Sequence, residues 1–194
     1  MAEYLARQPG GKIGEEQAIG ILLPILDGLR EVHAQRFLHR DIKPQNIYLT
    51  TGNRPILLDF GAARIAMGER SRSLSVVLSE GYAPIEQYQR NGRQGPWTDV
   101  YGAAATLYQM VTGLSPPPAT ERMGDTGEAL EGLSQVTLAL AAVIEQGLRP
   151  APADRIQSIP ALQSLLLDQP LPDPLPGRQP PSPATAQAKT NKGW

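Results

Sequence analysis

One segment of this 194-residue sequence, from Asp99 to Thr112, is apolar almost all the way around a helix. A helix without a polar face has to be covered on every side, as happens in the middle of a helical bundle. Gly113 and a run of three prolines follow the segment, which is a typical helix ending. Its apolar members are Val100, Ala103, Ala104, Ala105, Leu107, Met110 and Val111. We therefore expect a fold built around one central, buried helix.

Further helices and a small hairpin are predicted around this central helix. Two short apolar runs, 47–49 and 56–58, flank the sequence Thr51-Gly52-Asn53 and predict a β-hairpin. In the first predicted helix, Pro24 is expected to cause a kink or to cost a hydrogen bond. The predicted fold class is mainly α with a small β-hairpin. Apolar residues at helical spacing place these further helices over residues 15–35, 136–148 and 159–167.

The C-terminal part has a different composition. From Asp168 onward the sequence holds 7 prolines in 27 residues and few branched or aromatic side chains. Such a segment buries too little apolar surface to offset the entropy of ordering it, and proline favours an extended backbone over a helix. We expect a folded domain over residues 1–167 and a disordered, proline-rich tail over residues 168–194. A PxxP spacing from Pro180 to Pro183 fits an SH3-like ligand, but the composition alone accounts for one such match.

Charge and cysteine content exclude several functional classes. The 18 basic and 19 acidic residues nearly balance, so nothing favours a nucleic-acid partner or an anionic membrane. The absence of cysteine excludes disulfide frameworks, cysteine zinc sites and thiol nucleophiles, and it is compatible with a reducing compartment. The first residues do not form a signal peptide, and no run of about 18 apolar residues occurs. We expect a cytoplasmic protein with no membrane segment within this chain.

Two polar motifs flank the predicted hairpin. The sequence His39-Arg40-Asp41-Ile42-Lys43-Pro44-Gln45-Asn46 precedes it, and Asp59-Phe60-Gly61 follows it. Asp59 comes 18 residues after Asp41. Eight ordered matches in this loop, hairpin and loop arrangement are very improbable by chance. The pair resembles the catalytic loop and the magnesium-binding motif of protein kinases.

The resemblance implies a role for each polar residue, with ATP and Mg²⁺ as cofactors. Phosphoryl transfer depends on placing a hydroxyl in line with the γ-phosphate and on neutralising charge on its oxygens. Asp41 would accept or orient the hydroxyl proton, and Lys43 would hold the γ-phosphate. Asn46 and Asp59 would supply oxygens to magnesium, and Tyr48 would form part of the floor under adenine. His39 and Phe60 are expected to pack beneath the loop rather than to react.

The sequence beyond Gly61 extends the resemblance. Residues 62–80 are polar and rich in serine and arginine, as in a kinase activation loop. The sequence Gly81-Tyr82-Ala83-Pro84-Ile85-Glu86 resembles the Ala-Pro-Glu motif that closes this loop, although its proline stands one position early. Ser79 occupies the place of a threonine that in the family contacts the catalytic aspartate and lysine.

Four charged residues are assigned structural roles by the same resemblance. Glu86 would form a buried ion pair with Arg155, and Asp99 would hold the backbone of the catalytic loop. The alternative for each is an ordinary surface charge. Arg40 has two interpretations, a packed ion pair or the acceptor of a phosphate on the activation loop. Ser71, Ser73 and Ser75 are candidate phosphorylation sites that would dock toward Arg40 and Arg64, and the alternative is a loop without phosphorylation.

Together these features resemble the C-terminal lobe of a bacterial, eukaryotic-like (Hanks-type) serine/threonine protein kinase, over residues 15–167. Lys43 favours serine and threonine over tyrosine as the acceptor. The implied reaction is ATP-dependent phosphorylation of a protein substrate. The retained residues Asp41, Lys43, Asn46 and Asp59 argue for this reaction, since a lobe long freed from catalysis has no physical need of all four. The alternative is a non-catalytic, kinase-like interaction module.

The N-terminal lobe of such a kinase has no counterpart in the sequence before His39. Only 38 residues precede it, and they contain neither a Gly-rich phosphate loop nor a lysine on a predicted strand, because Lys12 lies in a loop. We therefore expect a truncated kinase domain that is inactive alone, or one completed by a separate chain carrying the N-lobe. The upper face of the lobe should then expose apolar side chains.

Overall fold

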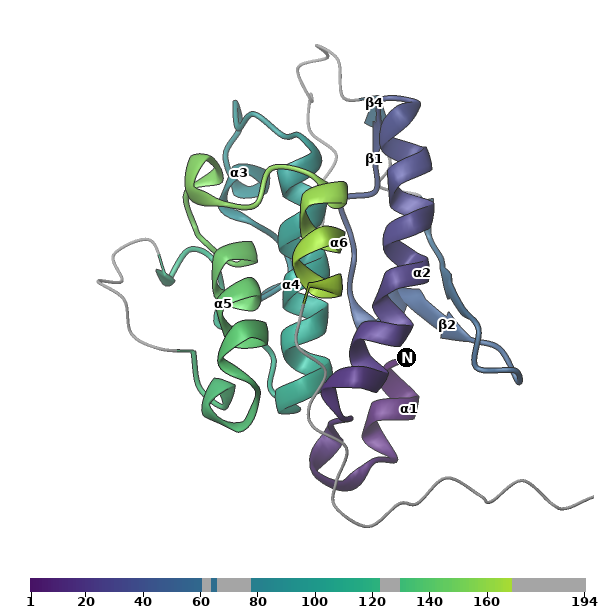
Figure 1. Ribbon diagram of the computed structural model, residues 1–194. Helices are drawn as coiled ribbons and strands as arrows, with labels where there is room; N and C mark the ends of the chain where they lie inside the picture. The colour runs from purple at the N-terminus through teal and green to yellow at the C-terminus, as the bar shows by residue number, and fades with distance from the viewer. Residues whose placement is uncertain (61–63, 66–77, 123–129, 169–194) are drawn as a thin grey trace, which may run out of the picture.

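The computed structural model describes residues 1–60, 64–65, 78–122 and 130–168 (Figure 1). The predicted tail after Asp168 lies outside the described residues. The candidate phosphorylation sites Ser71, Ser73 and Ser75 lie outside them as well. Within the described part, no helix is both long enough and apolar enough to cross a membrane.

A central helix, α4 (Pro96–Thr112), organises the fold. Three helices pack against it: α2 (Glu15–Ala34), α5 (Leu138–Gly147) and α6 (Ile159–Leu167). In Figure 1, α4 lies between α5 on one side and α2 on the other, and α6 lies against both α2 and α4. Nearly every side chain of α4 is buried, so the predicted central helix is confirmed.

Close helix contact explains one small residue of this core. A Cβ atom placed on Gly147 would lie only 2.6 Å from the Cβ atom of Ala104. Helices α5 and α4 can therefore approach this closely only because position 147 has no side chain. The central helix ends at Gly113, whose φ of 79° is left-handed, and its amide donates to the carbonyl of Gln109.

The observed helix limits differ slightly from the predicted ones. Helix α4 begins three residues earlier than predicted, because Pro96 suits the first turn and the hydroxyl of Thr98 accepts a hydrogen bond from the Gly95 amide at 3.2 Å. Helix α5 begins later than predicted, since the Thr137 hydroxyl caps it by accepting from the Leu140 amide. Helix α2 runs through Pro24 as one element of 20 residues.

Short helical elements complete the described part. The chain begins with α1 (Ala2–Ala6), and α3 (Ile85–Tyr88) precedes the central helix. The short 3₁₀ turns are Pro9–Gly11, Pro44–Asn46, Leu133–Gln135 and Pro152–Asp154. Helix α3 was not predicted, because four residues are too few to show a helical period.

The predicted hairpin is confirmed as strands β2 (Ile47–Leu49) and β3 (Pro55–Leu57), which pair antiparallel with Tyr48 opposite Ile56. It lies beside α2 in Figure 1. Asn53 turns the chain with a left-handed φ of 58°, a conformation that asparagine tolerates.

A second pair of strands was not predicted. Strand β1 (Phe37–Leu38) pairs antiparallel with β4 (Arg64–Ile65). The predicted fold class, mainly α with a small β-hairpin, is confirmed, and this second two-stranded sheet adds to it. Each strand has two residues, so neither carries an alternation that a sequence pattern could reveal.

Exposed apolar side chains occur on the hairpin, directly after it and on β1. They are Phe37, Tyr48, Ile56, Leu58 and Phe60, each between 40% and 54% exposed. The apolar side chains of α4, in contrast, are buried. We call these five residues the hairpin face.

Candidate active site

The loop between β1 and the 3₁₀ turn at Pro44–Asn46 carries Asp41, and a buried histidine fixes its start. His39 has no exposed surface. Its Nδ1 accepts the amide hydrogen of Asp41 at 3.3 Å, so its Nε2 is the protonated nitrogen that donates to the Leu58 carbonyl at 3.1 Å. The Phe60 ring meets it edge-on, with centroids 4.7 Å apart. His39 thus joins the loop to the end of the hairpin.

Asp99, from the first turn of α4, holds the backbone of this loop. Its Oδ2 accepts the His39 amide at 2.9 Å, and its Oδ1 accepts the Arg40 amide at 2.7 Å. His33 of α2 lies 2.7 Å from the same Oδ2. The Arg40 backbone is left-handed, with φ 71°, which is unfavourable for a residue with a Cβ. The buried carboxylate therefore fixes a strained turn just before Asp41.

Three of the predicted residues, Lys43, Asn46 and Ser79, surround the carboxylate of Asp41. Its Oδ1 accepts the hydroxyl hydrogen of Ser79 at 2.9 Å. Its Oδ2 accepts from the Asn46 amide at 2.8 Å and lies 2.9 Å from the ammonium of Lys43. Lys43 also donates to the Ser79 oxygen at 2.7 Å, which closes the ring of contacts. We call Asp41, Lys43, Asn46 and Ser79 the Asp41 network.

The network controls the ionisation of Asp41. Burial by itself would raise the pKa of this carboxyl. The hydrogen bonds from Lys43, Ser79 and Asn46, with the positive charge of Lys43, outweigh burial and lower the pKa below its ordinary value. Asp41 is therefore ionised throughout the neutral range, as an acceptor of a hydroxyl hydrogen must be.

Asn46 and Asp59 lie at the same end of the hairpin. The Leu58 amide donates to the Asn46 carbonyl at 2.7 Å, so Asp59 follows directly after the partner of Asn46. Asp59 has a left-handed φ of 61°. The Asn46 amide nitrogen donates to the carbonyl of Asp41 at 2.7 Å as well as to its carboxylate, which leaves the amide oxygen available to a cation.

This donor set fits magnesium. Mg²⁺ is bound by one or two carboxylates together with waters and substrate phosphates, and it needs no cage made only of protein. Among the described residues, no cluster of three or more histidine, cysteine or acidic side chains forms such a cage. That Asn46 and Asp59 share one metal ion remains a prediction. Tyr48, predicted for the adenine floor, is 54% exposed on β2.

Glu86 and Arg155 form a buried, two-pronged ion pair. Arg155 Nη1 lies 2.7 Å from Oε1 of Glu86, and Nη2 lies 3.3 Å from Oε2. The guanidinium also stacks 4.9 Å above the ring of Tyr101. All five of its N–H groups are used, since it donates further to the carbonyls of Arg149, Pro150 and Trp97. The pair anchors α3 to the start of α4 and to the segment before α6.

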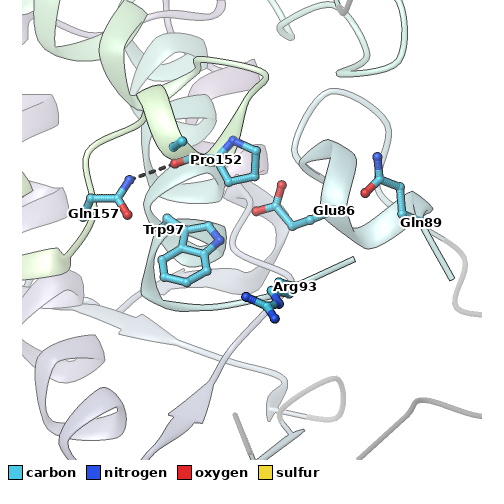
Figure 2. A pocket seen from close by; sticks show the side chains of 7 residues that line it. Glu86, Gln89, Arg93, Trp97, Pro152 and Gln157 are labelled. Carbon is cyan, nitrogen blue, oxygen red and sulfur yellow. Dashed lines mark hydrogen bonds between the residues drawn. The ribbon is translucent and has the colours of Figure 1, made fainter. Parts of the chain in front are cut away.

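A surface pocket of about 290 Å³ lies beside this ion pair, on the side shown in Figure 2. The side chain of Gln157 closes one edge by donating to the Pro152 carbonyl at 2.8 Å. None of the Asp41 network lines the pocket. Its lining residues are Glu86, Gln89, Arg93, Trp97, Pro152, Ala153 and Gln157.

Two residues that hold the loop, one of them through Asp99, were missed by sequence reasoning. His33 lies on α2, 66 positions before Asp99, and Gln87 lies on α3, where its amide reaches the Arg40 carbonyl at 2.8 Å. His33 follows the last apolar residues of a helix and carries no spacing signal. Gln87 directly follows Glu86. Its place next to a residue with an assigned role was the one feature of the sequence that could have drawn attention to it.

Comparisons with known proteins agree with this geometry. The family described as "Protein kinase domain" matches residues 2–166. Serine/threonine-protein kinase C of Synechocystis sp. is 37% identical over 155 residues, which cover 75% of this chain and 28% of the relative. Serine/threonine-protein kinase PknA of Nostoc sp. is 34% identical over 154 residues, covering 75% of this chain and 27% of the relative.

A solved structure also resembles this chain in fold and sequence. The structure titled "PpkA-294 apo form" has a TM-score of 0.68 and 30% identity, and the match covers 85% of this chain and 59% of that one. The chain thus spans less than a third of the two curated relatives and over half of the solved structure. On the match over residues 2–166 and the matching fold, this chain belongs to the protein kinase family.

Proposed function

We propose that this chain is the large lobe of a serine/threonine protein kinase and that Asp41 acts on the hydroxyl of a protein substrate. The Asp41 network carries the proposal. It keeps one carboxylate ionised and fixes it with three neighbouring side chains, Lys43, Asn46 and Ser79, yet leaves 24% of the Asp41 side chain exposed. A buried structural carboxylate would have no such opening.

Each member of the network has a defined task in phosphoryl transfer. Asp41 accepts or orients the hydrogen of the incoming serine or threonine hydroxyl. Lys43 neutralises charge on the transferred phosphoryl group, and its bond to the Ser79 oxygen at 2.7 Å holds the ammonium near the place of transfer. Ser79 contacts both groups and so fixes their separation.

Asn46 and Asp59 would hold magnesium. The amide oxygen of Asn46 and the carboxylate of Asp59 are hard ligands at one end of the hairpin. Bound there with ATP, Mg²⁺ would neutralise charge on the phosphate oxygens. The protein's own contribution is the antiparallel pairing of β2 and β3, which brings Asn46, before β2, and Asp59, after β3, to the same end of the hairpin.

The hairpin face is where we place the ATP-binding small lobe. Tyr48 and the other four residues of this face are 40% to 54% exposed, whereas large apolar side chains at the centre of the bundle are wholly buried. A small lobe would cover them and supply the phosphate loop and lysine that residues 1–38 lack. We propose that such a lobe, in the same protein or in a separate chain, completes the site. We place the reaction in the cytoplasm, where ATP and protein substrates meet.

The alternative is a non-catalytic interaction module, favoured by the same exposed face. A face with five exposed large apolar side chains suits a protein partner as well as a small lobe. The two functions differ in what the Asp41 network does, since a module does not need the ionised carboxylate. Activity after substitution of Asp41 therefore separates them.

The test joins this chain to a small lobe taken from the Synechocystis relative and measures phosphate transfer from ATP to a generic serine/threonine substrate. We expect no transfer by the chain alone, and magnesium-dependent transfer by the completed domain. Asp41→Asn should abolish it, while Asp154→Asn, an exposed aspartate in the turn before Arg155, should not change it.

Two results would contradict the proposal. Transfer by residues 1–194 alone that needs Asp41 would show that no small lobe is required. Failure of every completed domain, together with tight binding of a partner to the hairpin face, would establish the interaction module instead. A partner's binding is measured with Tyr48→Ser as the control that removes part of the hairpin face.

A further inference from the structure

A side chain without a task in the proposed reaction contacts the peptide just before Asp41. Gln87, from α3, donates from Nε2 to the carbonyl oxygen of Arg40 at 2.8 Å. The other end of the same amide, Oε1, is buried and accepts no hydrogen bond from the part of the chain that the structure describes. Exchanging the two amide atoms would set two oxygens against each other, so the bond to Arg40 fixes the orientation of the amide.

The backbone of Arg40 needs this support. Its φ of 71° is left-handed, an unfavourable conformation for any residue with a Cβ. Asp99 holds the amide of Arg40 at 2.7 Å, and Gln87 holds its carbonyl. The next amide, that of Asp41, makes only a long contact of 3.3 Å to the ring of His39. Of these two contacts to the peptide between Arg40 and Asp41, the bond from Gln87 is the shorter and therefore the stronger restraint.

Gln87 is itself held in place. The preceding residue, Glu86, is held by the buried ion pair with Arg155. The backbone N–H of Gln87 donates to the Pro84 carbonyl at 3.0 Å. A side chain that begins from such a fixed backbone loses little entropy when its amide settles on the loop. A rigid connection thus runs from Arg155 through α3 to the peptide that carries Asp41.

We propose that Gln87 is a positioning residue: by holding the Arg40 carbonyl it fixes the peptide plane between Arg40 and Asp41, and so the direction of the Asp41 carboxylate. The structural part of this inference depends only on the contact. Its importance for catalysis rests on the proposed function. Gln87 links the anchored helix α3 to the reacting carboxylate without touching the substrate.

The first experiment measures the contact in the 194-residue chain by NMR. Gln87→Met keeps the length of the side chain and removes the donor. We expect an upfield shift of the Arg40 carbonyl carbon and about 3- to 10-fold faster hydrogen exchange of the Asp41 amide, as for the loss of one hydrogen bond. Gln89→Met is the matched control, since Gln89 is exposed and lies two positions further on. It should change neither signal.

The second experiment measures kinetics in the completed kinase domain. Gln87→Met should lower kcat about 3- to 10-fold and leave the KM for ATP unchanged, because the bond affects placement rather than nucleotide binding. Gln87→Glu, with the same shape, should lower kcat further, since its carboxylate would face the Arg40 oxygen. The urea midpoint should stay the same for Gln87→Met, because that change also removes the unsatisfied Oε1.

The outcomes separate the inference from the proposed function. The inference would be overturned if Gln87→Met and Gln87→Glu both left the Arg40 carbonyl shift and the Asp41 amide exchange rate unchanged. Altered NMR signals with an unchanged kcat would overturn it as well. A fall in kcat that merely follows a lower urea midpoint would show a general structural role and would also overturn it. If the wild-type domain is inactive, the proposed function fails, and the NMR signals alone then decide whether Gln87 places Asp41. If Gln87→Met does not fold, Gln87→Glu provides the same readouts.

Discussion

Glu86 and Arg155 meet at 2.7 Å with side chains that are almost wholly buried, whereas Asp41 and Lys43 meet at 2.9 Å with about a quarter of each side chain exposed. Both are pairs of a carboxylate with a cation, and both are about equally short. They differ in what surrounds them. The first is closed by backbone carbonyls and an aromatic ring, and the second by polar side chains and solvent.

The difference separates an anchor from a reactive site. Every N–H group of Arg155 has a partner, so its guanidinium has no donor left for a ligand. The Asp41 carboxylate is also well bonded, but it keeps an open side through which a hydroxyl can approach. Burial therefore stabilises the fold at one pair, and partial exposure leaves the other free for chemistry. Substitutions at the two pairs should affect different measurements.

The largest expected effect on stability comes from Arg155→Met. It leaves the Glu86 carboxylate buried without its cation, a change that costs about 3 to 5 kcal/mol in comparable sites. The measurement is the free energy of unfolding in urea. Arg90→Met, at an exposed arginine near the end of α3, is the control and should cost less than about 0.5 kcal/mol. Equal losses for the two variants would show that the buried pair is no anchor.

A smaller loss is expected for Asp99→Asn, in the first turn of α4. The carboxylate accepts two backbone amides and contacts His33, and a neutral amide cannot accept all three contacts. Hydrogen bonds to charged groups contribute about 1.5 to 3 kcal/mol, so we expect a loss of about 2 to 3 kcal/mol in urea unfolding. Asp154→Asn, at an exposed site, should leave the free energy of unfolding unchanged.

How much of this the sequence could predict follows from the range of each interaction. The central helix and the hairpin were predictable, because their signals lie within about 14 neighbouring residues. Asp41, Lys43, Asn46 and Ser79 were identified by a resemblance, and the structure brings them together. Their catalytic roles, and the sharing of a metal ion by Asn46 and Asp59, stay predictions.

What the sequence could not predict depends on contacts between distant positions. The role of His33 depends on its contact with Asp99, 66 positions away. In the sequence alone, His33 is one polar residue near the end of a helix. The pairing of Phe37–Leu38 with Arg64–Ile65 joins two strands that are each too short for a pattern. Gln87 contacts a backbone carbonyl, and any residue type can supply that partner, so no motif encodes it.

A smaller, pH-dependent effect on the free energy of unfolding is expected at the pair of Asp41 and Lys43. The pKa of Asp41 is lowered in the folded chain, because hydrogen bonds and the charge of Lys43 outweigh burial. A lowered pKa stabilises the fold at pH values above the unfolded-state value of about 3.8, and the stabilisation disappears as the pH falls through the lower folded-state pKa. Solvent screens this partly exposed pair, so we expect a contribution of less than about 1 kcal/mol at pH 7.

The variant that isolates this contribution is Asp41→Asn. The difference in unfolding free energy between wild type and variant should be present at pH 7 and should shrink as the pH falls below about 3.8, measured by urea unfolding at each pH. A difference that grows as the pH falls would contradict the lowered pKa. In the completed kinase domain the same change should abolish phosphate transfer at pH 7, so activity and stability would respond very differently at this pair.

The smallest effect on stability is expected for Tyr48→Ser on the hairpin face. Tyr48 is 54% exposed opposite Ile56, so its loss should change the free energy of unfolding by no more than about 0.5 kcal/mol. In the completed domain it should nevertheless raise the Kd for ATP, because the ring is expected to form part of the floor under adenine. Titration with a fluorescent ATP analogue measures this. Leu167→Ser, at a 65% exposed position of α6, should change neither quantity. A large loss of stability with unchanged ATP binding would show that Tyr48 stabilises the fold, as the Glu86–Arg155 pair does, and does not bind nucleotide. The proposed separation of stabilising residues from site residues would then be wrong for the hairpin.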